Sequence, residues 1–226
     1  MSSPSPINDV PQHIQKLLSE LHAKSIEQEA AISKTGKVFS SDVLDYLEDQ
    51  HQSVADPAGE FDKLMLDKFI ALDEDKCHFV YQLITAMGAT NVVEAGTSFG
   101  SGVVIATEKE AQKAEVARGY WRQCGAAVEG EIDLRVGDLL ETLKEGLPQV
   151  DLLLLDIWAP LALPTLKVVL PRLRKGAVIL ADNTISGAEG YKDLLAFLRE
   201  PQNGFQNMTL PFTNGLEMCV YLPGSG

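Results

Sequence analysis

From Asn91 onward, short apolar runs alternate with helix-like segments, and this rhythm constrains the fold more than any other feature of the sequence. The runs are NVVEAG, VVIATE, IDLRVGD, DLLLLDIW and AVILADN. Continuous apolar runs of this length are typical of parallel strands that are covered by helices on both faces. We therefore predict an α/β three-layer sandwich with a mostly parallel sheet.

The segments between and after these runs predict the remaining elements of the sandwich. Helical patterns are found at 109–124, 163–173 and 191–199. The chain ends with two strand-like runs, FQNMTLPF and LEMCVYLP, which are joined through a turn-rich connection at 213–215. Two strands with such a connection predict a C-terminal β-hairpin.

The first 90 residues follow a helical pattern instead. Residues 1–11 contain Ser, Pro and Asn with little periodic apolar content, and we expect them to form a flexible tail. Four later stretches have the residue spacing or capping pattern of helices: 14–26, 41–50, 60–72 and 75–87. We predict that residues 12–90 form a helical region packed on a core of residues 91–226, within one domain.

Charge and hydropathy exclude several classes of partner. The net charge is −13, from 32 acidic and 19 basic residues, and no local basic stripe offsets it, so we expect no nucleic-acid partner. No apolar run approaches the roughly 20 residues that span a bilayer, and the start lacks the features of a secretion signal. We expect a cytoplasmic protein with no membrane partner, either a monomer or a homodimer.

A first group of residues could bind a nucleoside. The turn from Gly96 to Gly100 follows a buried strand, and its glycines would let the backbone approach a ligand closely, although such turns also serve geometry alone. Glu108 ends the next strand, where an acid can accept hydrogen bonds from both ribose hydroxyls or stabilise a helix N-terminus. Asp138 could contact an adenine amino group or cap the following helix.

A second group of residues could bind a metal ion. Asp156 follows LLLL, and Asp182 and Asn183 follow VILA, so both sites lie at predicted strand ends. Three oxygen donors suit a hard cation such as magnesium. The alternative is that each acid caps a helix or turns a loop. We favour the metal site because two such strand ends occur and an asparagine stands beside an aspartate.

Taken in order, these residues resemble the catechol O-methyltransferase type of S-adenosylmethionine-dependent O-methyltransferase, which includes the caffeoyl-CoA O-methyltransferases and their fungal and bacterial relatives. The resemblance covers roughly Asp75 to the end of the chain. It rests on the ordered motifs VVEAGTSFG, TEKE, VGD, LLDIW, RLRKGAVILADN and NGLEMCVY. It implies a Rossmann-like class I methyltransferase fold.

The resemblance also implies the cofactors and the site. S-adenosylmethionine would donate the methyl group, and Mg²⁺ or another divalent cation would assist its transfer to a small phenolic or catechol-like hydroxyl. The cofactor would be bound by Glu94, Gly96, Thr97, Ser98, Gly100, Glu108, Lys109, Asp138 and Asp156. The metal ligands would be Asp156, Asp182 and Asn183. The substrate would meet Trp158, Asn183 and Glu217, and the catalytic residues would be Asp156 and Glu217.

Two features depart from the family's pattern. The family places a lysine that can take the phenol proton three residues after the first metal-binding aspartate, where this chain has Ala159. Only residues 101–102 separate Gly100 from the strand at Val103, although neighbouring parallel strands need a crossover of about a dozen residues, so the first sheet-covering helix is missing. The chain is then a shortened variant, a sequence that lacks residues, or a fold in which VVIATE pairs differently. We favour the first two.

Two other functions compete with methyl transfer. The short connection and Ala159 favour a degenerate methyltransferase fold that binds a nucleoside or a protein partner without catalysis. The joint presence of five acidic and amide side chains favours the enzyme: Glu108, Asp156, Asp182, Asn183 and Glu217. A nicotinamide-dependent dehydrogenase would share the α/β order, but the chain has no GxGxxG turn.

Overall fold

The computed structural model describes residues 5–34, 71–96 and 103–224. The chain divides into two compact units, Ile7–Glu74 and a larger one formed by Met1–Pro6 with Asp75–Gly226. The helix predicted at 41–50 and almost all of the helix predicted at 60–72 lie outside the described residues, as does the start of the predicted tail.

The smaller unit contains helix α1 (Gln12–Lys34), which includes the predicted helical stretch at 14–26. Pro11 stands just before the helix, and its carbonyl accepts hydrogen bonds from the first-turn backbone N–H groups of Ile14 and Gln15. The Ser25 hydroxyl, which is buried, accepts a hydrogen bond of 2.9 Å from the backbone N–H of Ala71. This bond links α1 to the chain segment that leads into the larger unit.

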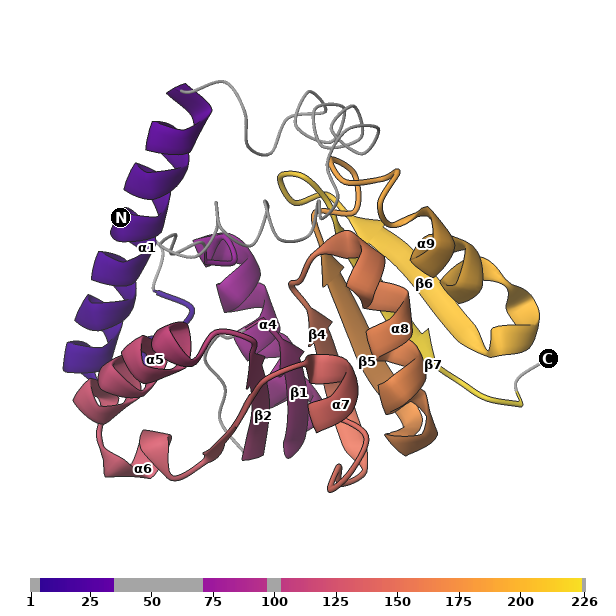
Figure 1. The fold of residues 1–226 in the computed structure, drawn as a ribbon, viewed down its shortest axis with the longest axis horizontal. Coiled ribbons are helices and arrows are strands. Elements are labelled where there is room, and N and C mark those ends of the chain that lie inside the picture. Colours follow the sequence, from indigo (N-terminus) through magenta and orange to yellow (C-terminus); the bar gives the residue numbers. More distant parts are fainter. Residues whose placement is uncertain (1–4, 35–70, 97–102, 225–226) are drawn as a thin grey trace. The chain divides into compact units, whose positions relative to one another are not determined.

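Seven strands form one sheet in the larger unit, in the order β3-β2-β1-β4-β5-β7-β6 (Figure 1). They are β1 (Asn91–Ala95), β2 (Val103–Glu108), β3 (Ile132–Val136), β4 (Val150–Leu155), β5 (Leu173–Asp182), β6 (Phe205–Leu210) and β7 (Leu216–Tyr221). Strands β1 to β5 run parallel to one another, whereas β7 is antiparallel to both β5 and β6. The mostly parallel sheet and the C-terminal hairpin are therefore confirmed.

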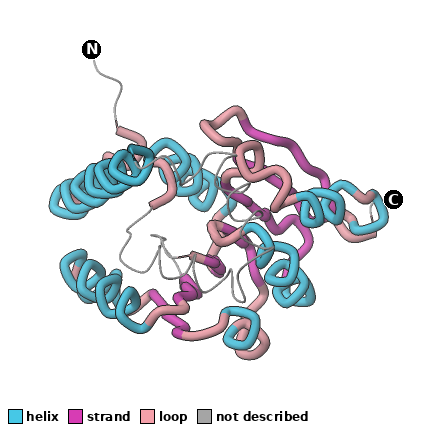
Figure 2. Tube along the Cα trace, turned by 45° about the horizontal axis from the view of Figure 1, so that its top comes forward, coloured by secondary structure: helices cyan, strands magenta, loops and turns pink. Residues whose placement is uncertain are grey.

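Helices flank this sheet (Figure 2). They are α4 (Glu74–Met87), α5 (Ala111–Cys124), α6 (Ala126–Glu129), α7 (Leu139–Thr142), α8 (Ala159–Val169) and α9 (Lys192–Arg199), with single 3₁₀ turns at Leu170–Arg172 and Pro201–Asn203. The sequence predicts that α8 starts at 163, but the helix starts four residues earlier, at Ala159. Pro160 therefore lies in its first turn, a position that suits proline. None of the helices within the described ranges is both long and apolar enough to cross a bilayer.

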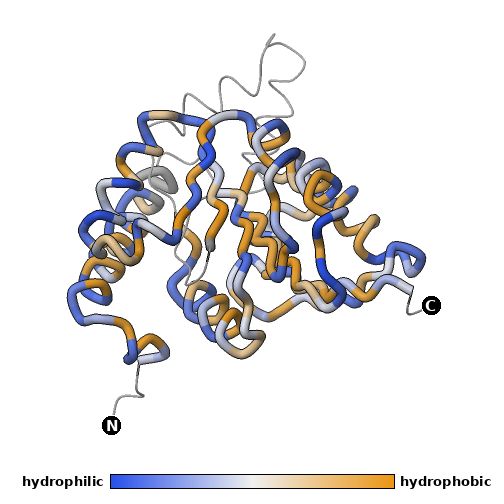
Figure 3. Tube along the Cα trace, turned by 90° about the horizontal axis from the view of Figure 1, so that it is seen from below, coloured by the Kyte–Doolittle hydropathy of each residue, from blue (hydrophilic) through white to orange (hydrophobic). Residues whose placement is uncertain are grey.

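The main core lies between one face of the sheet and helices α8 and α9. Val93, Leu153 and Ile179 are fully buried on three adjacent strands, and they pack with Leu166 of α8 and Leu198 of α9. The strands at the centre of the unit are accordingly apolar along most of their length (Figure 3). Burial on both faces explains why the strands read as continuous apolar runs in the sequence.

Strand β2 pairs in parallel with β1, from Asn91 opposite Val103 to Ala95 opposite Thr107. This excludes the third explanation for the short connection, which we did not favour, that VVIATE pairs differently. The sequence provides only residues 96–102 for the connection between these two strands, fewer than the dozen of an ordinary crossover, and the structure describes Gly96 alone among them.

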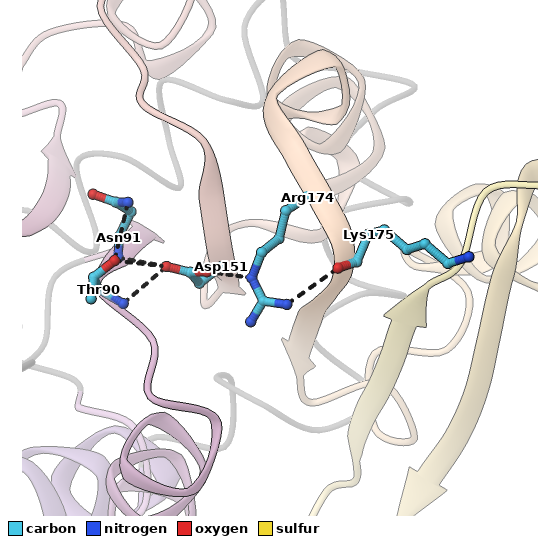
Figure 4. Close-up of polar contacts among 5 residues, drawn as sticks. All are labelled: Thr90, Asn91, Asp151, Arg174 and Lys175. Atoms are coloured by element: carbon cyan, nitrogen blue, oxygen red, sulfur yellow. Dashed lines mark hydrogen bonds and ion pairs between the residues drawn. The ribbon is translucent and has the colours of Figure 1, made fainter.

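A polar network joins the amino-terminal ends of β1, β4 and β5 (Figure 4). One carboxylate oxygen of Asp151 accepts hydrogen bonds of 2.9 Å from the backbone N–H groups of both Thr90 and Asn91. Its other oxygen accepts a short hydrogen bond from the Arg174 guanidinium. Burial raises the pKa of Asp151, but Arg174 and the two backbone donors outweigh burial and lower it overall.

We expect Asp151→Ala to reduce the free energy of unfolding by about 3 kcal/mol, because it removes a charge-assisted pair and leaves two backbone donors without their partner. Since the folded-state pKa of Asp151 is lowered, its contribution is present above about pH 4 and is lost as the pH falls through the folded-state value. Urea unfolding at pH 7 and at pH 3 would measure both effects. The control is Asp133→Ala, whose half-exposed pair with Arg135 should contribute less than about 1 kcal/mol.

Candidate functional site at the carboxyl edge of the sheet

Two aspartates occupy equivalent positions on adjacent strands. Asp156 directly follows β4, and Asp182 is the last residue of β5. Leu155 lies opposite Ala181 in the register, so the two aspartates reach the same edge of the sheet. Both carboxylates also act on Tyr191, whose pKa is raised first by burial and then by repulsion from Asp156 and Asp182. The structure therefore brings these two predicted ligands to one place.

Asn183 stands at the point where the chain leaves β5. Its backbone is left-handed, with φ of 58°, a conformation that asparagine adopts more readily than most residues. Its carbonyl accepts a hydrogen bond of 2.8 Å from the backbone N–H of Gly187, which fixes the turn. The half-buried Asn183 thus follows Asp182 directly at the carboxyl edge.

A buried cation lies against Asp182. The Nζ atom of Lys76, on α4, is 2.7 Å from Oδ1 of Asp182, and the two side chains are 0% and 5% exposed. Lys76 is not among the site residues predicted from the sequence. A signal was present, because Lys76, Val80 and Ile84 recur at intervals of four residues and are all buried, so the lysine continues the apolar stripe of α4.

The ends of β1 and β4 approach each other very closely at Gly96. A β-carbon at this position would lie 2.1 Å from the backbone oxygen of Asp156, and φ of Gly96 is +90°. The backbone N–H of Asp156 donates a hydrogen bond of 3.0 Å to the carbonyl of Ala95. Only glycine fits here, and it places the start of the predicted cofactor turn beside the predicted metal ligand.

The other predicted cofactor residues spread along the same edge. Glu108 ends β2, and its carboxylate accepts a hydrogen bond of 2.8 Å from the backbone N–H of Glu110. The carboxylate of Asp138 caps α7 by accepting a 2.8 Å hydrogen bond from Leu140. Glu94 is buried near the end of β1, and Lys109 is exposed after β2. Thr97, Ser98 and Gly100 lie outside the described residues.

Asp138 thus has the helix-capping role that was its alternative, whereas Glu108 accepts a hydrogen bond from the backbone N–H of Glu110, the residue that precedes α5. Each carboxylate has two oxygens, and one of them in each case receives a backbone donor. A backbone hydrogen bond to one oxygen leaves the second able to accept from a ligand. Cofactor binding by these two residues therefore stays a prediction.

Trp158 and Ala159 lie at the start of α8. Trp158 is half-buried and precedes the first residue of the helix. A β-carbon added to Gly190 would lie 2.9 Å from the β-carbon of Ala159. The position that carries a lysine in the resembled family is therefore filled here by a methyl group against the backbone of Gly190.

Glu217 lies on the other face of the sheet from Asp182. It pairs with Ala181 across β5 and β7, and neighbouring residues of a strand point to opposite faces. Its side chain is 1% exposed, ion-paired with Arg199 at 3.1 Å and hydrogen-bonded by the Thr209 hydroxyl. A role for Glu217 at a substrate hydroxyl stays a prediction.

The donor set at the carboxyl edge fits a hard divalent cation. Asp156, Asp182 and Asn183 supply carboxylate and amide oxygens, the ligands that Mg²⁺ prefers, and few protein ligands are typical because Mg²⁺ keeps several waters. Within the described ranges there is no cluster of three or more His, Cys, Asp or Glu side chains that would make a different metal site. Binding of a cation by these three residues stays a prediction.

Comparison with known proteins identifies the fold. No family model and no curated protein sequence matches this chain. Among solved structures, it is similar to the Streptomyces achromogenes O-methyltransferase TomG in complex with SAM, with 19% identity and a TM-score of 0.60 over 71% of this chain and 86% of that one. An O-methyltransferase from Bacillus cereus in complex with SAH has 18% identity and a TM-score of 0.59, over 67% and 82%.

A fungal structure extends this likeness. The SAH-bound methyltransferase PaMTH1 from Podospora anserina has 13% identity and a TM-score of 0.58, over 87% of this chain and 94% of that one. The strand order, with β7 antiparallel beside β5, agrees with this likeness. The described part of the chain therefore has the class I methyltransferase fold of the S-adenosylmethionine-dependent O-methyltransferases.

Proposed function

We propose that this protein is an S-adenosylmethionine-dependent O-methyltransferase that uses a divalent cation, Mg²⁺ by preference, to methylate a small phenolic or catechol-like hydroxyl. The observation that carries the proposal is the meeting of Asp156 and Asp182 at the carboxyl edge of adjacent parallel strands, beside the turn at Gly96. In open α/β sheets, ligands bind at this edge. The fold shared with SAM- and SAH-bound methyltransferases supports the same site.

The methyl donor would lie across the ends of β1, β2 and β3. Gly96 lets the chain turn away from β1 without a side chain, and Glu108 ends the neighbouring strand with an oxygen able to accept from a ribose hydroxyl. Asp138 follows β3 at the same edge. These residues would bind the donor and orient it for transfer of its methyl group. Methyl transfer is an in-line displacement, and its rate depends largely on such alignment.

The metal ligands would prepare the acceptor. Asp156, Asp182 and Asn183 would hold the cation, and a bound divalent cation lowers the pKa of a hydroxyl that contacts it. Ala159 has no group that can take the phenol proton, and Tyr191 has a raised pKa that keeps it protonated. We therefore propose that transfer depends on the ionised fraction of the acceptor, and that the rate rises with pH until the acceptor is fully ionised.

A second function is favoured by a specific observation. The short connection of residues 96–102 leaves no room for the crossover helix that would cover the sheet and point its N-terminus at the donor's carboxylate. If this loss abolishes the donor pocket, the chain would be a non-catalytic relative that binds a nucleoside or a protein partner. For either function, we propose that the protein is located in the cytoplasm.

Calorimetric titration of the purified chain with S-adenosylhomocysteine, with and without MgCl₂, separates the two functions. We expect binding in the micromolar range, because Gly96, Glu108 and Asp138 lie at the carboxyl ends of three neighbouring strands. Circular dichroism would establish that the sample is folded. A folded chain that does not bind S-adenosylhomocysteine would refute the enzyme proposal and favour the non-catalytic relative.

A further inference from the structure

We propose that Lys76 is a positioning residue, which holds Asp182 in the orientation that binds the divalent cation. The inference rests on the proposed function, because it assigns a second layer of contacts to the same metal ligands. Neither the fold nor the motifs of the sequence assign Lys76 a role. The geometry of its ion pair with Asp182 points to one.

The pair is fully enclosed and joins two elements that are far apart in the sequence. Lys76 lies near the start of α4, Asp182 ends β5, and Nζ and Oδ1 are 2.7 Å apart with side chains 0% and 5% exposed. Helix α4 is also held from its next turn, where the Phe79 ring contacts Phe212 in the β6–β7 connection, with centroids 5.5 Å apart. Lys76 therefore approaches Asp182 from a fixed helix.

Stability alone does not explain this pair. Transfer of two charged groups from water into a protein interior is costly, and well-packed apolar side chains of similar volume stabilise a fold equally well or better. Val80 and Ile84 show that the same stripe of α4 accepts apolar residues. A buried ion pair that includes a predicted metal ligand is therefore better explained by the ligand's function.

The contact restricts the orientation of the Asp182 carboxylate. Oδ1 faces the Lys76 ammonium at 2.7 Å, so the carboxylate cannot rotate without breaking this ion pair. Partners that orient metal ligands in this way contribute about 10- to 100-fold to metal affinity or activity. Lys76 thus sets the direction from which Asp182 binds the cation.

The test is titration of the full chain with Mn²⁺, followed by calorimetry, for the wild type and for Lys76→Met. We expect Lys76→Met to bind Mn²⁺ at least about 10-fold more weakly. The sign of the change in Mn²⁺ affinity is decisive, because removing a nearby positive charge would by itself strengthen cation binding. The control is Lys192→Met, an exposed lysine paired with Glu189, which should leave Mn²⁺ affinity unchanged.

Lys76→Gln completes the test, because glutamine can donate a hydrogen bond to Asp182 without carrying a charge. We expect its Mn²⁺ affinity to lie between those of the wild type and Lys76→Met, and it replaces Lys76→Met if that variant does not fold. Unchanged or tighter Mn²⁺ binding by either folded variant would overturn the inference and leave the proposed function standing. A wild-type chain that binds S-adenosylhomocysteine but not Mn²⁺ would overturn the inference together with the metal-assisted mechanism.

Discussion

Asp156→Asn should lower the rate of methyl transfer to a catechol-like acceptor by at least about 100-fold and change the melting temperature little. The substitution keeps the size of the side chain and removes the charge that would bind the cation. The hydrogen bond that fixes this position to β1 comes from the backbone N–H of Asp156 and survives the change. Initial rates over a range of Mg²⁺ concentrations, with thermal unfolding in parallel, would measure both quantities.

The matched control for this substitution is Asp193→Asn. Asp193 is exposed in the first turn of α9, where an acid stabilises the helix by less than about 1 kcal/mol. It should show the wild-type rate and the wild-type dependence on Mg²⁺. An Asp156→Asn variant that methylates the acceptor within about threefold of the wild type would refute the assignment of Asp156 as a metal ligand, because a lost ligand costs far more.

The sheet could be predicted from the sequence because its strands are buried on both faces. Such strands leave continuous apolar runs, and β4, with every residue buried, is the clearest example. The hairpin was predictable from its turn, where Asn214 and Gly215 both have positive φ. The strand-end acids were predictable because the carboxyl ends of parallel strands share one edge of the sheet.

Contacts between distant elements could not be predicted in the same way. The register places Glu217 beside Ala181 and so on the opposite face from Asp182, and no local pattern in β7 determines which strand it will pair with. The apolar stripe of α4 indicates that Lys76 is buried, but its partner Asp182 is known only once α4 is placed against the end of β5. These features depend on tertiary packing, which outweighs local sequence preference.

Gly96→Ala should reduce the free energy of unfolding by about 4 kcal/mol and abolish binding of S-adenosylhomocysteine. The added β-carbon would lie 2.1 Å from the Asp156 carbonyl oxygen and 3.1 Å from its carbonyl carbon. Since both are backbone atoms, no side chain can rotate away, and the ends of β1 and β4 must separate. That movement would also break the hydrogen bond from Asp156 to Ala95. Urea unfolding and calorimetric titration would test the two effects.

Gly125→Ala is the control that separates the cost of the steric clash at Gly96 from the cost of backbone strain. Gly125 has φ of +109°, similar to the +90° of Gly96, but a β-carbon there would meet no atom within 4 Å. Gly125→Ala should therefore reduce the free energy of unfolding only by the cost of the strained backbone, about 1–3 kcal/mol, and should bind S-adenosylhomocysteine normally. The difference between the two variants in free energy of unfolding measures the cost of the clash between residue 96 and the Asp156 backbone. Equal losses of stability, with binding retained in both, would mean that Gly96 serves only to turn the chain.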